Sequence, residues 1–235
     1  MNVVETTLGA IVGRNNRAVA SHASDRFARN PRDVDSLPWH RALVAAYPTI
    51  RAEWDAFAGA GQRLPRIEDL IDEHQGNEGD WRAGLLVSRG RPIGPLGDRF
   101  PRTLAALAQV PGLWSALWSE LDAGTELPAH EGPNAGMLRY HLGIDCGDGA
   151  ALQVGDRITP YRDGEGILFD DTVTHAAWNR GERPRITLFC EILRPVDGPV
   201  RFSNLAVQRL LSLDARYRRA PARAGEWDRT LNGGR

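Results

Sequence analysis

The stretch MLRYHLGIDCGDGAALQVGDRITPYRDGEGILFDDTVTHAAWNRGERPRITLFCEIL, residues 137–193, decides the fold. It consists of short runs rich in aliphatic, aromatic and β-branched residues, which are separated by turn dipeptides such as Asp148-Gly149 and Gly155-Asp156. The runs predict strands at 137–144, 151–154, 158–161, 166–169, 175–179 and 185–193. Short strands at this spacing are typical of an antiparallel sandwich or barrel.

The sequence on either side of this stretch has a different, mostly helical pattern. Apolar residues recur at three- and four-residue spacing from Trp39 to Phe57, which predicts a helix that Pro48 should break or kink. We also expect a loosely packed leader over 1–35 that becomes helical, helices at 65–74, 100–107 and 204–217, and a strand at 85–87. The chain is expected to fray from residue 220. We expect one compact unit with a helical N-terminal layer (1–80), a β core (81–200) and a C-terminal helix with a frayed tail (201–235).

The composition limits the classes of function. The chain has 235 residues, of which 42% are hydrophobic, and its net charge is −1, so it has no bulk attraction for nucleic acid. We find no apolar run long enough to span a bilayer, no secretory signal, and no paired-cysteine motif around Cys146 or Cys190. These features favour a reducing, cytoplasmic setting without a membrane partner.

All 29 basic side chains are arginine. This excludes Schiff-base chemistry and a Walker A phosphate site, because both need a lysine. An anion that this chain binds through a cationic side chain must therefore meet a guanidinium or an imidazole. Arginine is the better bidentate partner for a carboxylate.

Three of the six histidines lie in the predicted β half. His130 lies at a strand edge or loop, His141 lies inside a strand with Arg139 facing the same way, and His175 begins a strand. Two neutral imidazoles from separate strands can hold a divalent metal, although a lone barrel histidine is more often a core residue. The usual third ligand, a carboxylate two residues after the first histidine, is replaced by Gly132. The other histidines (His22, His40 and His74) are expected at the surface or in packing.

Several motifs between about Gly112 and Pro195 match one family. They are PAHEGP (128–133), LRYHLG (138–143), FDDTVTHAAWN (169–179) and RPR (183–185). In their order and spacing the chain resembles the aspartyl/asparaginyl β-hydroxylase family of iron- and 2-oxoglutarate-dependent oxygenases. The resemblance implies a mainly β protein with flanking helices and a double-stranded β-helix core, which is a jelly-roll or cupin-like barrel.

The resemblance also implies a site and a reaction. His130 and His175 match the two iron ligands of a family that has glycine where other oxygenases have a carboxylate. The remaining matches are to residues that hold the distal carboxylate of 2-oxoglutarate (Arg185 and Ser119) and to residues near its metal-chelating end (Arg139 and His141). The implied enzyme uses Fe(II), 2-oxoglutarate and O₂ to hydroxylate an unactivated carbon of an amino acid, peptide or other small molecule, and it releases succinate and CO₂.

Some expectations depart from the best-known relatives. Met137 stands where the animal enzymes have a substrate-binding arginine, so we expect Met137 and Trp178 to line a substrate pocket. Asp170 and Asp171 are expected to cap backbone N–H groups of a turn. Three alternatives stay open at this stage: halogenation at the iron position that Gly132 leaves open, a non-catalytic cupin-like binding protein, and purely structural roles for His141 and Arg139.

Overall fold

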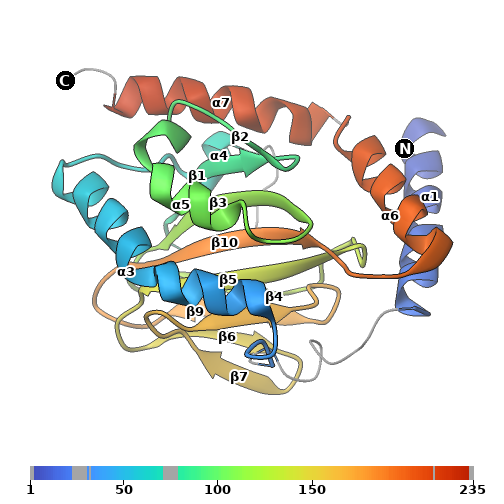
Figure 1. The fold of residues 1–235 in the computed structure, drawn as a ribbon, viewed down its shortest axis with the longest axis horizontal. Helices are drawn as coiled ribbons and strands as arrows, with labels where there is room; N and C mark the ends of the chain where they lie inside the picture. The colour runs from blue at the N-terminus through green and yellow to red at the C-terminus, as the bar shows by residue number, and fades with distance from the viewer. Residues whose placement is uncertain (1–2, 23–30, 32, 71–78, 214, 233–235) are drawn as a thin grey trace.

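A computed structural model describes residues 3–22, 31, 33–70, 79–213 and 215–232 (Figure 1). Within these residues the strands form two antiparallel sheets. The six-stranded sheet has the order β2 (Arg91–Pro92), β1 (Trp81–Ser88), β3 (Leu113–Leu121), β10 (Arg185–Leu193), β5 (Met137–Asp145) and β8 (Gly166–Phe169). The four-stranded sheet has the order β4 (Glu126–His130), β9 (His175–Asn179), β6 (Ala150–Val154) and β7 (Arg157–Pro160).

This arrangement confirms the predicted mainly β fold with a jelly-roll core and flanking helices. Each strand predicted between residues 137 and 193 is found to within one residue at either end. The sequence reasoning did not identify β3 or β4 as strands, and it saw only the middle of β1. The central strands β3, β10 and β5 pair over almost their full lengths, so they form a rigid platform with two faces.

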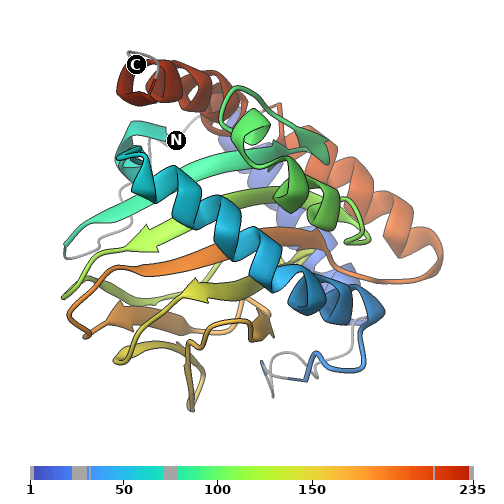
Figure 2. The same cartoon turned by 60° about the vertical axis from the view of Figure 1, so that its left-hand side comes forward.

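The outer face of the six-stranded sheet packs against helices (Figure 2). Helix α3 (Pro38–Gly59) and helix α5 (Pro101–Leu107) both begin with proline, which suits the first helical turn. Trp118 of β3 contacts Trp54 and Phe100, with ring centroids 5.0 Å apart in each pair. Helix α3 runs through Pro48 without interruption, so the prediction of a break there was wrong.

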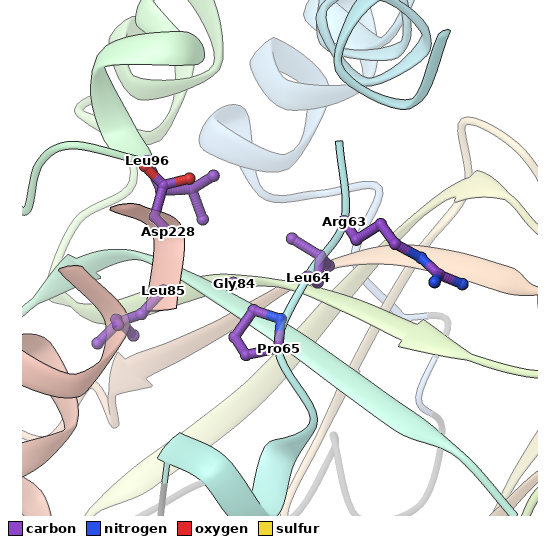
Figure 3. Close-up of a pocket in the computed structure, with 8 residues that line it drawn as sticks. Arg63, Leu64, Pro65, Gly84, Leu85, Leu96 and Asp228 are labelled. Carbon is purple, nitrogen blue, oxygen red and sulfur yellow. The ribbon is translucent and has the colours of Figure 1, made fainter. Parts of the chain in front are cut away.

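The inner face of the same sheet is covered by two different layers. Strands β6, β8 and β9 enclose an apolar cluster that includes Leu152, Phe169 and Ala177. Over β1 and β3 the cover comes instead from α4 (Ile67–Leu70) and α7 (Ala215–Asn232), which meet around Ala83 and Ala224. A gap of about 10 Å³ lies beside Leu64, Gly84 and Leu96, whose positions can be followed in Figure 3; it is a packing defect and too small for a substrate.

The C-terminal region differs from its prediction. The helix expected over 204–217 is two helices, α6 (Gly198–Leu211) and α7, and the tail expected to fray from Ala220 is helical to Asn232. Trp227 and Ala224 pack in the cluster beneath α7, and Asp228 pairs with Arg99 of the 3-10 helix η1 (Gly97–Arg99), which explains the order of this tail.

The N-terminal leader is helical, as predicted, and forms α1 (Val3–Ala20) beside α6 (Figure 1). The short helix expected over 65–74 is found only as α4, and its part from residue 71, with His74, lies outside the described residues. In the portion of the chain that the structure describes, no helix combines the length and apolar character needed to cross a bilayer.

Candidate functional site

Two histidines meet across the four-stranded sheet. His130, at the end of β4, lies directly opposite His175, at the start of β9, and their ring centroids are 4.2 Å apart. Each Nδ1 faces the carbonyl oxygen two residues earlier, that of Pro128 at 2.8 Å and that of Val173 at 2.9 Å. Because a carbonyl only accepts, each Nδ1 carries the proton and each Nε2 keeps a lone pair for a metal. Burial lowers the pKa of His175, which favours the neutral form that a ligand needs.

A buried arginine lies on the inner face of the six-stranded sheet. The Arg185 side chain of β10 is 2% exposed, and its guanidinium lies 4.7 Å over the ring of Tyr161. Ser119 of β3 accepts hydrogen bonds from Arg185 Nη2 at 3.1 Å and from Trp81 Nε1 at 3.0 Å. Within the described residues no carboxylate pairs with Arg185, and its Nε has no hydrogen-bond partner. A buried cation without an anion is costly, so this arrangement suits an anionic ligand.

His141 of β5 lies between the arginine and the histidine pair. Its Nδ1 is 2.8 Å from the Tyr161 hydroxyl, while its Nε2 is buried and has no partner among the described residues. Phe169 contacts the rings of both His141 and His175, at centroid distances of 5.4 and 5.3 Å, and so joins the two sheets here. Burial, and then the charge of Arg185, lower the pKa of His141 well below its ordinary value.

The protons of this pair follow from the available partners. Burial raises the pKa of Tyr161 to about 12, so its hydroxyl keeps its proton, and among the described residues His141 Nδ1 is the acceptor within reach of that proton. The single proton of the neutral imidazole then lies on Nε2. His141 therefore presents a hydrogen-bond donor that the described residues leave unused.

Arg139 also lies on the inner face of β5, but carboxylates already compensate its positive charge. It forms ion pairs with Asp171, at 2.9 Å from its Nε, and with Glu191 of β10. Asp170 caps Thr172 N as expected, but the expectation for Asp171 was wrong, because its carboxylate is buried and faces Arg139. The structural role weighed for Arg139, an ion pair, is observed, and its contact with 2-oxoglutarate stays a prediction.

The carboxylate of Asp171 also explains why residue 132 has no side chain. A Cβ atom added to Gly132 would collide with this carboxylate, and the Gly132 N–H bonds the Asp171 carbonyl oxygen at 2.6 Å. Among the described residues, no group of three histidine, cysteine or acidic side chains is arranged to hold a metal. Among the described residues, the candidate metal site is therefore this pair of histidines without a third protein ligand.

The two residues expected to line a substrate pocket fare differently. Met137 is buried at the start of β5, on the same face as Arg139, and its role stays a prediction. The role of Trp178 in a substrate pocket also stays a prediction, but its side chain lies on a different side from the histidine pair. Successive strand residues face opposite sides, so Trp178 faces away from His175, and it stacks on Arg180 at 4.7 Å.

A separate groove lies on the other side of the six-stranded sheet. It has a volume of about 340 Å³ and is lined by residues that include Trp54, Arg82, Glu120 and Asp145. Burial raises the pKa of the Glu120 carboxyl. This groove opens under the C-terminal half of α3, so the platform separates it from the histidine pair.

Sequence reasoning missed Tyr161 and Trp81, which hold His141 and Ser119 in place. Tyr161 was predicted only as the last residue of a strand, and Trp81 was given no role. Tyr161 follows β7 in the opposite sheet, so its contact with His141 depends on how the sheets pack. Trp81 could have been inferred, because it begins the strand β1 that pairs with β3.

The chain is similar to proteins that are named as hydroxylases or as containing a hydroxylase domain. Residues 44–195 match the family model for aspartyl/asparaginyl beta-hydroxylase. The ornithine lipid ester-linked acyl 2-hydroxylase of Rhizobium tropici is 32% identical over 183 residues, which are 76% of this chain and 65% of that protein. The aspartate beta-hydroxylase domain-containing protein 2 of Homo sapiens is 31% identical over 126 residues, 50% of this chain and 34% of that protein. The chain thus spans no more than about two thirds of these relatives.

Solved structures show weak overall likeness. A predicted oxalate decarboxylase from Thermotoga maritima aligns with a TM-score of 0.39 at 14% identity, over 57% of this chain and 95% of that one. A cupin domain of a transcriptional regulator from Enterobacter cloacae aligns with a TM-score of 0.35 at 14% identity, over 49% of this chain and 98% of that one.

Proposed function

Since the chain belongs to the aspartyl/asparaginyl β-hydroxylase family, we propose that it is an Fe(II)- and 2-oxoglutarate-dependent dioxygenase that hydroxylates an unactivated carbon. The observation that carries the proposal is the buried, uncompensated guanidinium of Arg185 on the same inner face as His141. A dicarboxylate with one end on Arg185 and the other at the histidine pair would supply the missing negative charge.

The side chains at the candidate site fit both iron and 2-oxoglutarate. His130 and His175 would hold the iron through Nε2, because both Nδ1 atoms are engaged by carbonyl oxygens. Bound iron would supply the activation of O₂, in the overall reaction of substrate, 2-oxoglutarate and O₂ to hydroxylated product, succinate and CO₂.

The remaining side chains would bind and orient the co-substrate. Arg185 would grip its distal carboxylate, and Ser119, which accepts from Arg185 and Trp81, still has its own proton to donate there. His141, with its proton on Nε2, would donate to an oxygen near the metal-chelating end. Phe169 and the apolar cluster around it would exclude water from the reacting centre.

The substrate is an amino acid, a peptide or another small molecule in this proposal. The relative at 32% identity is named for hydroxylating the ester-linked acyl group of an ornithine lipid. Acyl lipids are therefore tested beside free amino acids and peptides. Succinate formation, measured for each candidate, identifies the substrate class, and product mass with and without chloride separates hydroxylation from halogenation.

The cofactors are tested by adding Fe(II) and 2-oxoglutarate to the folded protein without oxygen. A weak visible charge-transfer band is expected in the wild type and not in His175→Ala, while His22→Ala, a change at an exposed histidine, should keep it. A folded wild-type protein without the band, or a His175→Ala variant that retains it, would refute the proposal.

A further inference from the structure

Helix α6 exposes an apolar stripe that its packing does not need. The side chains of Phe202, Leu213 and Leu210 are 73%, 65% and 40% exposed. Leu210 and Leu213 follow Phe202 by eight and eleven residues, a spacing that places them on one side of a helix and the turn that extends it. The opposite side of α6 is buried through Asn204 and Val207. The stripe therefore faces water although α6 is already packed.

The basic side chains around this stripe form no ion pair within the described part of the chain. The segments 6–22 and 198–213 contain no aspartate or glutamate, and Glu5, Asp197 and Asp214 directly adjoin them. The two segments carry Arg14, Arg17, Arg201 and Arg209, all exposed. Carboxylates elsewhere balance the net charge of the whole chain, so this surface concentrates positive charge locally.

Helix α1 lies beside α6 and carries further exposed side chains. It packs against α6 in the antiparallel direction, because Asn15 donates to the Asn204 side chain at 3.1 Å while Val19 packs near Val200. Ile11, one turn before Asn15, is 37% exposed. We call the exposed set the α1–α6 face; its members are Ile11, Phe202, Leu210 and Leu213 with Arg14, Arg17, Arg201 and Arg209.

We propose that the α1–α6 face docks on the surface of an anionic phospholipid bilayer. Phenylalanine and leucine side chains enter the boundary between headgroups and acyl chains, and arginines are attracted to anionic headgroups. A second copy of this chain is a less favourable occupant, because it would bring two sets of four arginines against each other. This proposal departs from the expectation, drawn from composition, that the chain has no membrane partner.

Docking through this face would bring the bilayer close to the histidine pair. Asn204 donates to the Gly136 carbonyl at 2.9 Å, and Gln208 exchanges two side-chain hydrogen bonds with Asn134, at 2.7 and 3.1 Å. The segment that carries Asn134 and Gly136 connects His130 to β5. The docking face is therefore fixed to the chain directly next to His130. The inference does not depend on the reaction proposed above.

The test is co-sedimentation of the full chain with vesicles of phosphatidylcholine, with or without about 30% phosphatidylglycerol. We expect binding to the anionic vesicles, which weakens at about 0.5 M salt, and little binding to phosphatidylcholine alone. The double change Phe202→Glu and Leu213→Glu should weaken binding about tenfold or more. Ile158→Glu is the matched control, because Ile158 is 57% exposed but lies on β7, so this variant should bind as the wild type does.

Three outcomes overturn the proposal. The first is no binding of folded wild-type protein to anionic vesicles, and the second is equal loss in the Ile158→Glu control. The third is a wild-type dimer that the double change converts to monomer without any effect on vesicles, since the face would then be an interface between copies. Circular dichroism verifies folding of each variant. His175→Ala should bind vesicles normally, so failure of the proposed reaction and failure of docking are told apart.

Discussion

Strand β5 alternates between two environments from one residue to the next. Tyr140 and Leu142 face the helices and belong to the large apolar cluster under α3 and α5, whereas Arg139 and His141 face the other sheet. The same alternation on β3 sends Trp118 outward and Ser119 inward. One set of strands thus supplies a packed face and a polar face.

The two faces differ in how many of their buried polar groups have a hydrogen-bond partner. On the outer face, the Tyr140 hydroxyl is paired with His40 Nδ1 at 2.8 Å, and the Trp118 indole N–H is the one buried donor of the described β3 and β5 residues there that has no partner. On the inner face, His141 Nε2, Arg185 Nε and the Thr187 hydroxyl are buried without a partner among the described residues. Unpaired buried groups cost stability, so their concentration on one face indicates that a ligand completes that face. The outer face stabilises the platform, whereas the inner face lowers the stability of the free protein and leaves polar groups available to a ligand.

The largest effect that we expect from this contrast is in Arg185→Met. The change should abolish 2-oxoglutarate binding, because no lysine or second uncompensated arginine on the inner face replaces the cation. The free energy of unfolding should stay equal or rise, because a buried charge without a carboxylate is removed. Calorimetric titration of 2-oxoglutarate with a redox-inert divalent metal, beside urea denaturation, measures both. Arg180→Met, at an exposed arginine, is the control, and retained affinity in Arg185→Met would contradict the assignment.

The reverse pattern is expected for Trp118→Ala. This change removes the ring that joins α3 and α5 to β3, and it should lower the free energy of unfolding by about 3–5 kcal/mol. Under conditions where the variant remains folded, its affinity for 2-oxoglutarate should match that of the wild type. Trp178→Ala, at the partly exposed tryptophan of β9, should cost much less stability. A large loss of affinity for 2-oxoglutarate in folded Trp118→Ala would contradict the assignment of stability to the outer face and binding to the inner face.

A smaller effect is expected for Tyr161→Phe. The phenyl ring keeps its place beneath Arg185, but the hydrogen bond to His141 Nδ1 is lost. We expect the KM for 2-oxoglutarate to rise about five- to tenfold, as for the loss of one buried hydrogen bond of about 1–1.5 kcal/mol, with a smaller change in kcat. Tyr47→Phe removes a hydroxyl from the outer side of the sheet and should leave this KM unchanged.

Much of the two-faced platform could be predicted from the sequence, since alternation in the central strands shows which residues share a side. Arg139 with His141 was predicted in this way. The same rule, counted from His175, places Trp178 on the opposite side of the four-stranded sheet. The site residues on separate strands came from the family motifs, and the structure brings His130 and His175 together.

Other features depend on packing between distant segments, which a local pattern does not contain. Tyr161 reaches His141 from the opposite sheet, and the Asp171 carboxylate fills the space beside Gly132 from the turn between β8 and β9. The order of the C-terminal helix depends on Trp227 and Ala224 meeting β1 and α4, whereas its own composition of arginine, glycine and proline predicts fraying.

The smallest effect that we expect tests the packed face through pH. Burial lowers the pKa of His40, against the opposing influence of Asp35, so the folded protein takes up this proton less readily than the unfolded chain does. Below the ordinary histidine pKa of about 6.5 the unfolded state therefore binds more protons, and stability falls as the pH falls. The contribution of His40 between pH 6.5 and 5.5 is at most about 1.4 kcal/mol. Urea denaturation at several pH values measures this. As the pH falls, the free energy of unfolding should decline less steeply in His40→Gln than in the wild type, and as steeply as in the wild type in His22→Gln, the exposed control. Equal slopes in all three proteins would mean that His40 is protonated in the folded state, and that the outer face tolerates a buried charge as the inner face does.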